Sequence, residues 1–254
     1  SKDAMVFFDD SKFEREQMKK FNPEVKVIEA PDNVSGFIDS IENSSYFYLT
    51  KEVTEEDKKK KYQYEINAKA KNLKEKFKEN EMDKYLIDLK MKLSIDTINQ
   101  NNFSRCIQML NKTNQFNMTT TRYSESTLKS YLKKNKVLSM VCKLEDKFGE
   151  HGITGLLTSK KIRNKYIIDN FLLSCRILGR EVETILIQEL FKLSIKNKIY
   201  LIDGIYKETQ KNSQCKNFYK TMQFKLIKKN NYRKNLKNTN IKQKEIMNVI
   251  YERN

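Results

Sequence analysis

The chain has 254 residues, enough for one or two domains with a real hydrophobic core. Its formal net charge of +17 arises from 50 basic and 33 acidic residues, and we interpret it as a solvated basic surface, with nucleic-acid binding as the less favoured alternative. Four cysteines without CxxC spacing and a single histidine argue against a zinc site. The sequence has no run of 18 apolar residues, which argues against a membrane span, and no signal peptide. We therefore expect reduced thiols in a cytoplasmic protein.

The first 50 residues have the pattern of a parallel α/β unit. Ala4–Phe8 and Val25–Ile28 are short apolar runs that predict buried strands, and Phe13–Phe21 between them has helical periodicity, with Ser11 as its N-cap. This strand–helix–strand order is half of a doubly wound sheet. Because the chain lacks an initiator Met and opens on a strand, we expect it to be a fragment of a longer protein.

Two carboxylates, Asp9 and Asp10, follow the first predicted strand. Ligands bind at the carboxyl ends of strands in open α/β sheets, and adjacent carboxylates there are typical Mg²⁺ ligands. The alternative is a helix cap with a solvated acid. The segment VFFDDSKFERE (Val6–Glu16) resembles the fourth motif of haloacid-dehalogenase-type phosphatases, whose aspartates bind Mg²⁺. The nucleophile motif of that family, DxDx[TV], is absent from the sequence, so we expect weak Mg²⁺ binding and no phosphatase activity.

From Thr54 to about Asn80 the sequence is rich in Lys and Glu with apolar residues at helical spacing, which predicts a long connecting helix. A second α/β unit is predicted from Lys90. Its elements are strand Met91–Ile95, helices Phe103–Thr113 and Ser124–Lys134, strands Val137–Leu144, Gly152–Thr158 and Tyr166–Leu178, helix Glu181–Ser194, strand Ile199–Ile205, helix Asn212–Met222 and strand Phe224–Ile227. Lys228–Asn254 is a basic tail, interpreted as a partly ordered helix.

The stretch Asp169–Arg180 carries the strongest chemical signal. An apolar strand runs through a glycine turn at Gly179 onto a helix N-terminus, where free backbone N–H groups and the positive helix end form an anion site. Arg176 and Arg180 flank this turn and suit a phosphate-bearing donor. Cys175 lies just before it and is a candidate acyl nucleophile, the alternative being a small buried core residue.

A base for Cys175 is suggested by strand pairing. If Arg163-Asn164 is a two-residue hairpin turn, His151 falls within about one residue of Cys175 across the two strands. His151 is therefore a candidate general base, or else a turn residue at the hairpin end.

The element order resembles the GNAT acyltransferase fold. Arg176-Ile177-Leu178-Gly179-Arg180-Glu181 resembles the GNAT pyrophosphate motif [QR]xxGx[GA] except at its last position, and Asn212 to Phe224 resembles NxxAxxxYxxxGF. The resemblance implies that Tyr219 is a general acid for the departing thiol. Glu181, bulky and anionic where Gly or Ala is usual, weakens the case for coenzyme A and favours a carrier-protein phosphopantetheine, unless its side chain points outward.

A longer resemblance is to FkbH-like proteins, which join a phosphatase-type domain to a GNAT-like domain. It rests on VFFDDSKFERE, NKTNQFNMTTTRYSE (Asn111–Glu125), DKFGEHGITG (Asp146–Gly155) and FLLSCRILGREVE (Phe171–Glu183). The resemblance implies transfer of a glyceryl-type unit from a small phosphorylated acyl donor to an acyl carrier protein. In the polar loop of the second segment, Asn114, Gln115 and Arg122 suit a hydroxylated donor, or else close the loop by local hydrogen bonds.

We therefore predict an α/β chain in which the end of a Rossmannoid phosphatase-like domain (1–50) and a helical connector (51–89) precede a GNAT-like domain (90–230) and a basic tail (231–254). In that GNAT-like domain we expect a mixed central sheet flanked by helices. The predicted function is acyl transfer to an acyl carrier protein thiol, without membrane or nucleic-acid partners. The alternatives are a GNAT-type N-acyltransferase using acyl-coenzyme A, and a non-catalytic basic binding module.

Overall fold

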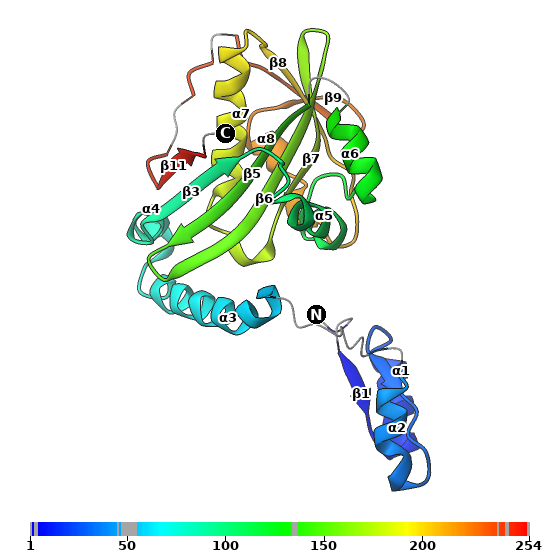
Figure 1. Ribbon diagram of the computed structural model, residues 1–254. Coiled ribbons are helices and arrows are strands. Elements are labelled where there is room, and N and C mark those ends of the chain that lie inside the picture. Colours follow the sequence, from blue (N-terminus) through cyan, green and yellow to red (C-terminus); the bar gives the residue numbers. More distant parts are fainter. Residues whose placement is uncertain are drawn as a thin grey trace. The chain divides into compact units, whose positions relative to one another are not determined.

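The structure is a computed structural model (Figure 1) that describes residues 2, 5–44, 46, 55–133, 137–237, 239–241 and 244–252, with backbone only for 55–61. It divides into two compact units, Ser1–Lys60 and Lys61–Asn254. No helix in the described part of the chain combines the length and the apolar character needed to cross a bilayer.

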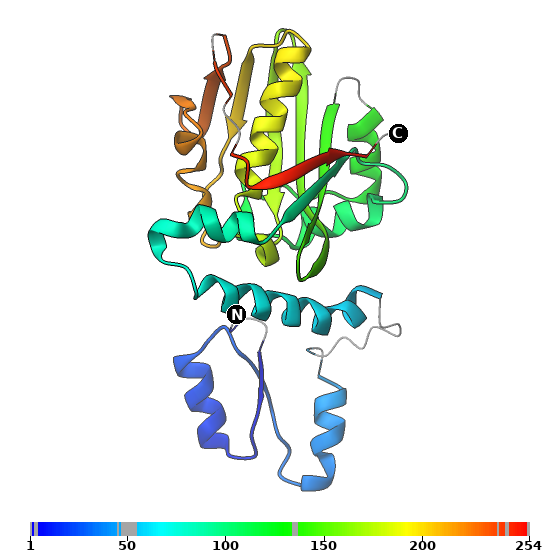
Figure 2. The same cartoon turned by 90° about the vertical axis from the view of Figure 1, so that its left-hand side faces the viewer.

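The second unit is built on a mixed sheet. Within the described residues this sheet has nine strands in the order β11-β3-β5-β6-β7-β8-β10-β9, with β4 paired to β7 outside that order (Figures 1 and 2). The strands are β3 (Met91–Asp96), β4 (Phe116–Asn117), β5 (Val137–Asp146), β6 (Gly149–Ile162), β7 (Lys165–Leu173), β8 (Leu201–Ile205), β9 (Lys225–Lys228), β10 (Asn231–Asn235) and β11 (Met247–Tyr251). β11 is parallel to β3 and β7 to β8, and the other pairs are antiparallel. The predicted mixed central sheet is confirmed.

Helices flank both faces of this sheet (Figure 2). α7 (Val182–Lys196) packs in the larger hydrophobic core, and α5 (Phe103–Lys112) and α6 (Glu125–Lys133) pack in a smaller one. Strand β7 contributes side chains to both cores, because neighbouring side chains of a strand point to opposite faces of the sheet. Phe171 lies in the larger core and Leu172 in the smaller one.

A long helix, α3 (Glu55–Lys74), is found where the connecting helix is predicted, although Thr54 lies outside the described residues. Ile66 and Ala70 are buried, and Gln63 Nε2 donates to a carbonyl of β6 at 2.7 Å, so this part of α3 packs in the second unit. The other helices there are η3 (Glu79–Glu81), α4 (Met82–Asp88), η4 (Cys175–Ile177), η5 (Ser213–Cys215) and α8 (Phe218–Thr221). The predicted boundaries at residues 50, 89 and 230 stay predictions.

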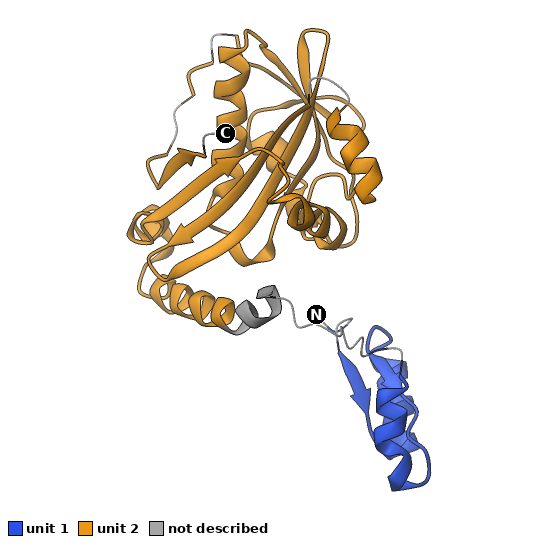
Figure 3. Ribbon diagram, viewed as in Figure 1, with its two compact units in different colours: residues 1–60 blue, residues 61–254 orange. Residues whose placement is uncertain are grey.

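The first unit (Figure 3) contains two parallel strands, β1 (Val6–Phe8) and β2 (Lys26–Ile28), with α1 (Lys12–Phe21) between them in the chain. Ser11 is the N-cap of α1, since its side chain accepts a hydrogen bond from the first turn. The short helices η2 (Val34–Gly36) and α2 (Phe37–Glu42) follow. The predicted strand–helix–strand order is confirmed, while Ala4 lies outside the described residues.

Two predictions about secondary structure are wrong. The strand predicted over Tyr166–Leu178 ends at Leu173, because Ser174 N makes a last hydrogen bond to Thr154 O at 2.7 Å and the chain then enters η4. The basic tail also contains two strands, β10 and β11, where a partly ordered helix is predicted. Long-range pairing with β8 and β3 outweighs the helical propensity of its lysines.

Candidate active site

Strands β7 and β8 run parallel and pair from Lys165–Leu201 to Ile168–Gly204, and β7 then continues beyond the last pair to its carboxyl end at Leu173. Cys175 follows this end as the first residue of η4 and is exposed. The other three cysteines are buried, and burial raises the pKa of Cys106 and Cys142 to about 12 and that of Cys215 to about 11. Cys175 is therefore the one exposed thiol in the described part of the chain, and it lies where ligands bind in open α/β sheets.

A left-handed turn connects η4 to α7. Gly179 has φ +79° and is exposed, and a Cβ at this position would meet no atom within 4 Å. Glu181 has φ +58°, and its carbonyl accepts from Ile185 N, the start of the α7 ladder. The N–H groups of the first turn therefore have no intrahelical acceptor and, together with the helix dipole, favour an anion.

Glu181 does not oppose an anion in the way that the sequence predicts. Its Oε1 lies 2.8 Å from Lys244 Nζ, and the same ammonium lies 3.1 Å from Asp83 Oδ1. The negative charge of Glu181 is thus matched by a lysine, and the objection to coenzyme A that rests on that charge is removed.

Glu183, in the first turn of α7, is a residue that sequence reasoning missed. Its Oε2 is buried and has no hydrogen-bond partner among the described residues. Burial raises the pKa of Glu183, and the nearby charge of Glu181 acts in the same direction. Burial therefore disfavours the charged form of this carboxyl in the first turn of α7.

Arg180 and His151 are not placed as predicted. His151 Nε2 lies 2.9 Å from Asp146 Oδ2 and 2.9 Å from Arg180 Nη1, and Arg180 also forms an ion pair with that carboxylate. All three residues are buried. Burial acts to raise the pKa of Asp146, but the hydrogen bond with His151 and the charge of Arg180 outweigh it, and the pKa is lowered. Arg180 is thus committed to the fold rather than to a donor.

The predicted pairing of His151 with Cys175 is also wrong. The hairpin turn at Arg163-Asn164 is confirmed, since Ile162 pairs with Lys165. A register shift follows, however, and the last described pair joins Gly155 to Leu173. His151 lies four residues beyond that pair and faces the buried cluster, whereas Cys175 lies two residues beyond it and is exposed.

The polar loop does reach the end of β7. Phe116 of β4 pairs with Leu173, so Asn114 and Gln115 come directly before the strand that pairs with the end of β7. Arg122 donates to Leu110 O at 2.6 Å and also to Asn114 Oδ1, so it binds the carboxyl end of α5 and holds the loop. This geometry supports the loop-closing alternative for Arg122, and donor binding by this loop stays a prediction.

The remaining predicted site residues of the second unit are Arg176 and Tyr219. Arg176 is half-buried, and its Nε donates to Ser174 Oγ at 3.1 Å. Tyr219 is 1% exposed and packs against Gly204, where an added Cβ would collide with its ring. Its hydroxyl has no hydrogen-bond partner among the described residues, and burial raises its pKa. Its role as a general acid stays a prediction.

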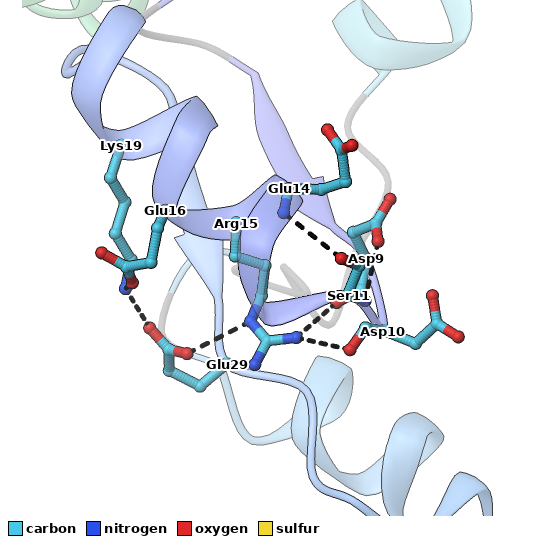
Figure 4. A network of polar contacts seen from close by, with 8 residues as sticks. All are labelled: Asp9, Asp10, Ser11, Glu14, Arg15, Glu16, Lys19 and Glu29. Atoms are coloured by element: carbon cyan, nitrogen blue, oxygen red, sulfur yellow. Dashed lines mark hydrogen bonds and ion pairs between the residues drawn. The ribbon is translucent and has the colours of Figure 1, made fainter.

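Asp9 and Asp10 make structural contacts within the first unit. Asp9 Oδ1 accepts from Ser11 N at 2.9 Å, and the carbonyl oxygens of both aspartates accept from Arg15 Nη1 (Figure 4). The Asp10 carboxylate points away from Arg15. No group of three or more His, Cys, Asp or Glu side chains in the described residues is arranged to hold a metal ion. The geometry therefore does not support the predicted Mg²⁺ site.

Comparisons with known proteins give matches to solved structures. No family profile and no curated protein matches the chain. Solved structures do match it: the ribosomal-protein-S18-alanine N-acetyltransferase of Escherichia coli (10% identity, 59% of this chain and 99% of that chain, TM-score 0.45), a GNAT-family acetyltransferase of Staphylococcus aureus Mu50 (12%, 57% and 99%, 0.44), and the PaiA N-acetyltransferase of Thermoplasma acidophilum in complex with coenzyme A (16%, 56% and 98%, 0.41). These likenesses concern the fold alone.

Proposed function

We propose that residues 61–254 form a GNAT-type acyltransferase that takes its acyl group from a phosphate-bearing thioester at the carboxyl end of β7. The observation that carries this proposal is the position of Cys175. An exposed thiol lies at the end of a parallel strand, one short turn before the N-terminus of a 15-residue helix. A nucleophile beside an anion site is an arrangement suited to covalent acyl transfer from a phosphorylated carrier.

The donor is acyl-coenzyme A. Its pyrophosphate would bind the free N–H groups at the start of α7, and Gly179 leaves open space beside them. The ion pair of Glu181 with Lys244 supports this donor, because the lysine matches the negative charge at the helix end. The acceptor is an amine, as in the N-acyltransferase alternative.

Covalent transfer would proceed in two balanced steps. The thiolate of Cys175 attacks the acyl carbonyl, a new S–C bond forms, and coenzyme A leaves as its thiolate, which takes up a proton. The acceptor amine then attacks the Cys175 thioester, the S–C bond breaks, and the amine proton is released.

The test uses the whole chain incubated with acetyl-coenzyme A. We expect one added acetyl mass on the peptide that contains Cys175, and loss of this adduct in Cys175→Ala. Cys106→Ala is the matched control, because Cys106 is buried in the smaller core. Coenzyme A binding with transfer that survives Cys175→Ala would mean direct attack by the amine. No binding of coenzyme A would reject the proposal and favour a non-catalytic module.

A second candidate is transfer to the phosphopantetheine thiol of an acyl carrier protein, and the charge around α8 and β9 favours it. Glu208 is the one acidic residue between Tyr206 and Lys244 in the sequence. Lys220 on α8, and Lys225 and Lys228 on β9, are exposed. Such a surface suits an acidic protein partner.

Reversing the charge of the exposed lysines on β9 distinguishes transfer to a carrier protein from transfer to an amine. Lys225→Glu with Lys228→Glu would abolish salt-sensitive binding of an acidic carrier protein and leave acetyl-coenzyme A chemistry unchanged. Lys129→Glu, on α6, is the matched control. Equal carrier binding by both variants would contradict the second candidate.

A further inference from the structure

The sheet of the second unit has β9 at one edge and β11 at the other, and these two strands differ in character. β9 (KLIK) carries a lysine at each end, all of its side chains are exposed, and its register with β10 shifts after Asn231. β11 (MNVIY) contains no charged residue and pairs with β3 in an unbroken register. Charges and bulges protect the edges of natural sheets from pairing with other chains. β9 has this protection, and β11 lacks it.

The free edge of β11 presents a row of backbone groups. Glu252 N, just after the strand, donates to Ile95 O of β3 at 2.9 Å. Because successive residues of a strand turn their N–H and C=O groups to opposite sides, those of Met247, Val249 and Tyr251 point away from β3. Among the described residues, β3 is the one strand that pairs with β11. No other element of the second unit lies outside β11 in Figure 1 or in front of it in Figure 2.

The side chains of β11 hold the strand in place before any partner binds. Met247 and Val249 pack against the larger core, and Tyr251 Oη donates to the carboxylate of Glu189 on α7, a residue that is 2% exposed. Ile250 points to the opposite face of the sheet and is 37% exposed. Since the strand is already ordered, pairing along its free edge would cost little further conformational entropy.

We infer that β11 is a dimerisation strand, which pairs with β11 of a second copy of this chain, antiparallel about a two-fold axis at Val249. In this register Val249 faces its own counterpart and Met247 faces Tyr251, so every outward N–H and C=O group of the two strands finds a partner. An axis at Asn248 or Ile250 would instead leave one outward residue beyond the end of the partner strand. The two-fold arrangement closes on itself, so it gives a dimer rather than a fibre.

Charges next to β11 in the sequence favour a second copy as the occupant. Glu245 precedes the strand and Arg253 follows it. By sequence position, the axis at Val249 sets Glu245 of each copy opposite Arg253 of the other, whereas a parallel pairing in register would set each charge opposite itself. Opposite charges across a strand pair are stabilising and like charges are destabilising. The inference does not depend on the proposed acyl transfer.

The experiment is sedimentation velocity of the whole chain up to about 200 μM, because pairing of one strand makes a small interface and a weak dimer. We expect a dimer that grows with concentration. Val249→Pro removes an outward N–H donor from each copy and should weaken the dimer at least about tenfold, while the pairing with β3 is kept. Ile250→Lys, at an exposed position, should weaken it about threefold, since the two new charges become diagonal neighbours across the axis.

Ile227→Lys is the matched control, since Ile227 is 45% exposed on the opposite edge strand, and the dimer should persist in it. A disulfide tests the register. Val249→Cys, in a Cys175→Ala background without the exposed thiol, should crosslink two copies, because opposed Cα atoms of a hydrogen-bonded antiparallel pair lie about 5.5 Å apart. A monomer at every concentration, a dimer unchanged by Val249→Pro and Ile250→Lys, or a dimer without this crosslink would each overturn the inference.

Discussion

The two arginines of the turn between β7 and α7 lie four positions apart and have different surroundings. Arg176 is half-buried, and its Nε donates to Ser174 Oγ. Arg180 is 5% exposed and is paired with Asp146 and His151. One belongs to the exposed region around Cys175, and the other to a buried cluster that joins the β5–β6 turn to the start of α7.

This difference shows that two arginines of one turn can have different surroundings, one half-buried beside an exposed thiol and one buried in an ion-pair cluster. The buried cluster fixes the turn, and the exposed region presents the thiol and the helix end. A substitution in the cluster should therefore act on stability, whereas one in the exposed region should act on binding or on local strain.

The largest effect is expected for Arg180→Ala. It leaves the Asp146 carboxylate buried without its cation, which costs about 3–5 kcal/mol of unfolding free energy. Urea unfolding followed by circular dichroism measures this loss. Arg163→Ala, in the exposed hairpin turn, is the control and should change stability by less than about 0.5 kcal/mol. An unchanged stability with weaker donor binding would return Arg180 to the donor site.

The second prediction concerns the loss of folding stability at low pH. The folded-state pKa of Asp146 is lowered, so its contribution to stability is present above the unfolded pKa, about 3.9, and is lost as the pH falls through the folded value. Asp203, whose pKa is also lowered, acts in the same direction. Asp146→Asn should therefore show a shallower loss of stability on acidification than the unaltered chain.

Urea midpoints measured from neutral pH down to about pH 3 test this slope separately from the overall destabilisation of Asp146→Asn. Parallel curves for the variant and the unaltered chain would show that Asp146 does not couple stability to pH.

The smallest effect is expected in the turn itself. Gly179→Ala should cost about 1–2 kcal/mol from the left-handed backbone alone, since a Cβ there meets no atom within 4 Å. Glu181→Gly is the matched opposite change. It relieves the strain at φ +58° but loses the ion pair with Lys244, so the net gain should be below about 1 kcal/mol. Thermal unfolding measures both, and a stabilising Gly179→Ala would contradict the argument.

Much of the local structure could be predicted from the sequence. The strand–helix–strand order of the first unit, the hairpin at Arg163-Asn164 and the glycine turn before α7 all follow from patterns within a few neighbouring residues. The position of Cys175 just before the glycine turn was also predictable, but neither the end of β7 at Leu173 nor the exposure of the thiol was. A Cys in an apolar run is usually buried, but β7 ends at Leu173, and Ser174 N makes a last hydrogen bond to Thr154 O of β6.

The tertiary structure alone decided which groups meet. The extra residue at Asp169 shifts the β6–β7 register and brings Asp169 to the side of α6, where Tyr131 bonds to it. The end of β7 at Leu173 and the burial of His151 separate His151 from the exposed Cys175. Likewise, β10 and β11 join the sheet through pairing with strands far away in the chain. Local patterns of apolar residues and turns determine elements, because their physics involves near neighbours. Register, burial of a charge and the partner of an arginine depend on contacts between distant segments, which no local pattern specifies.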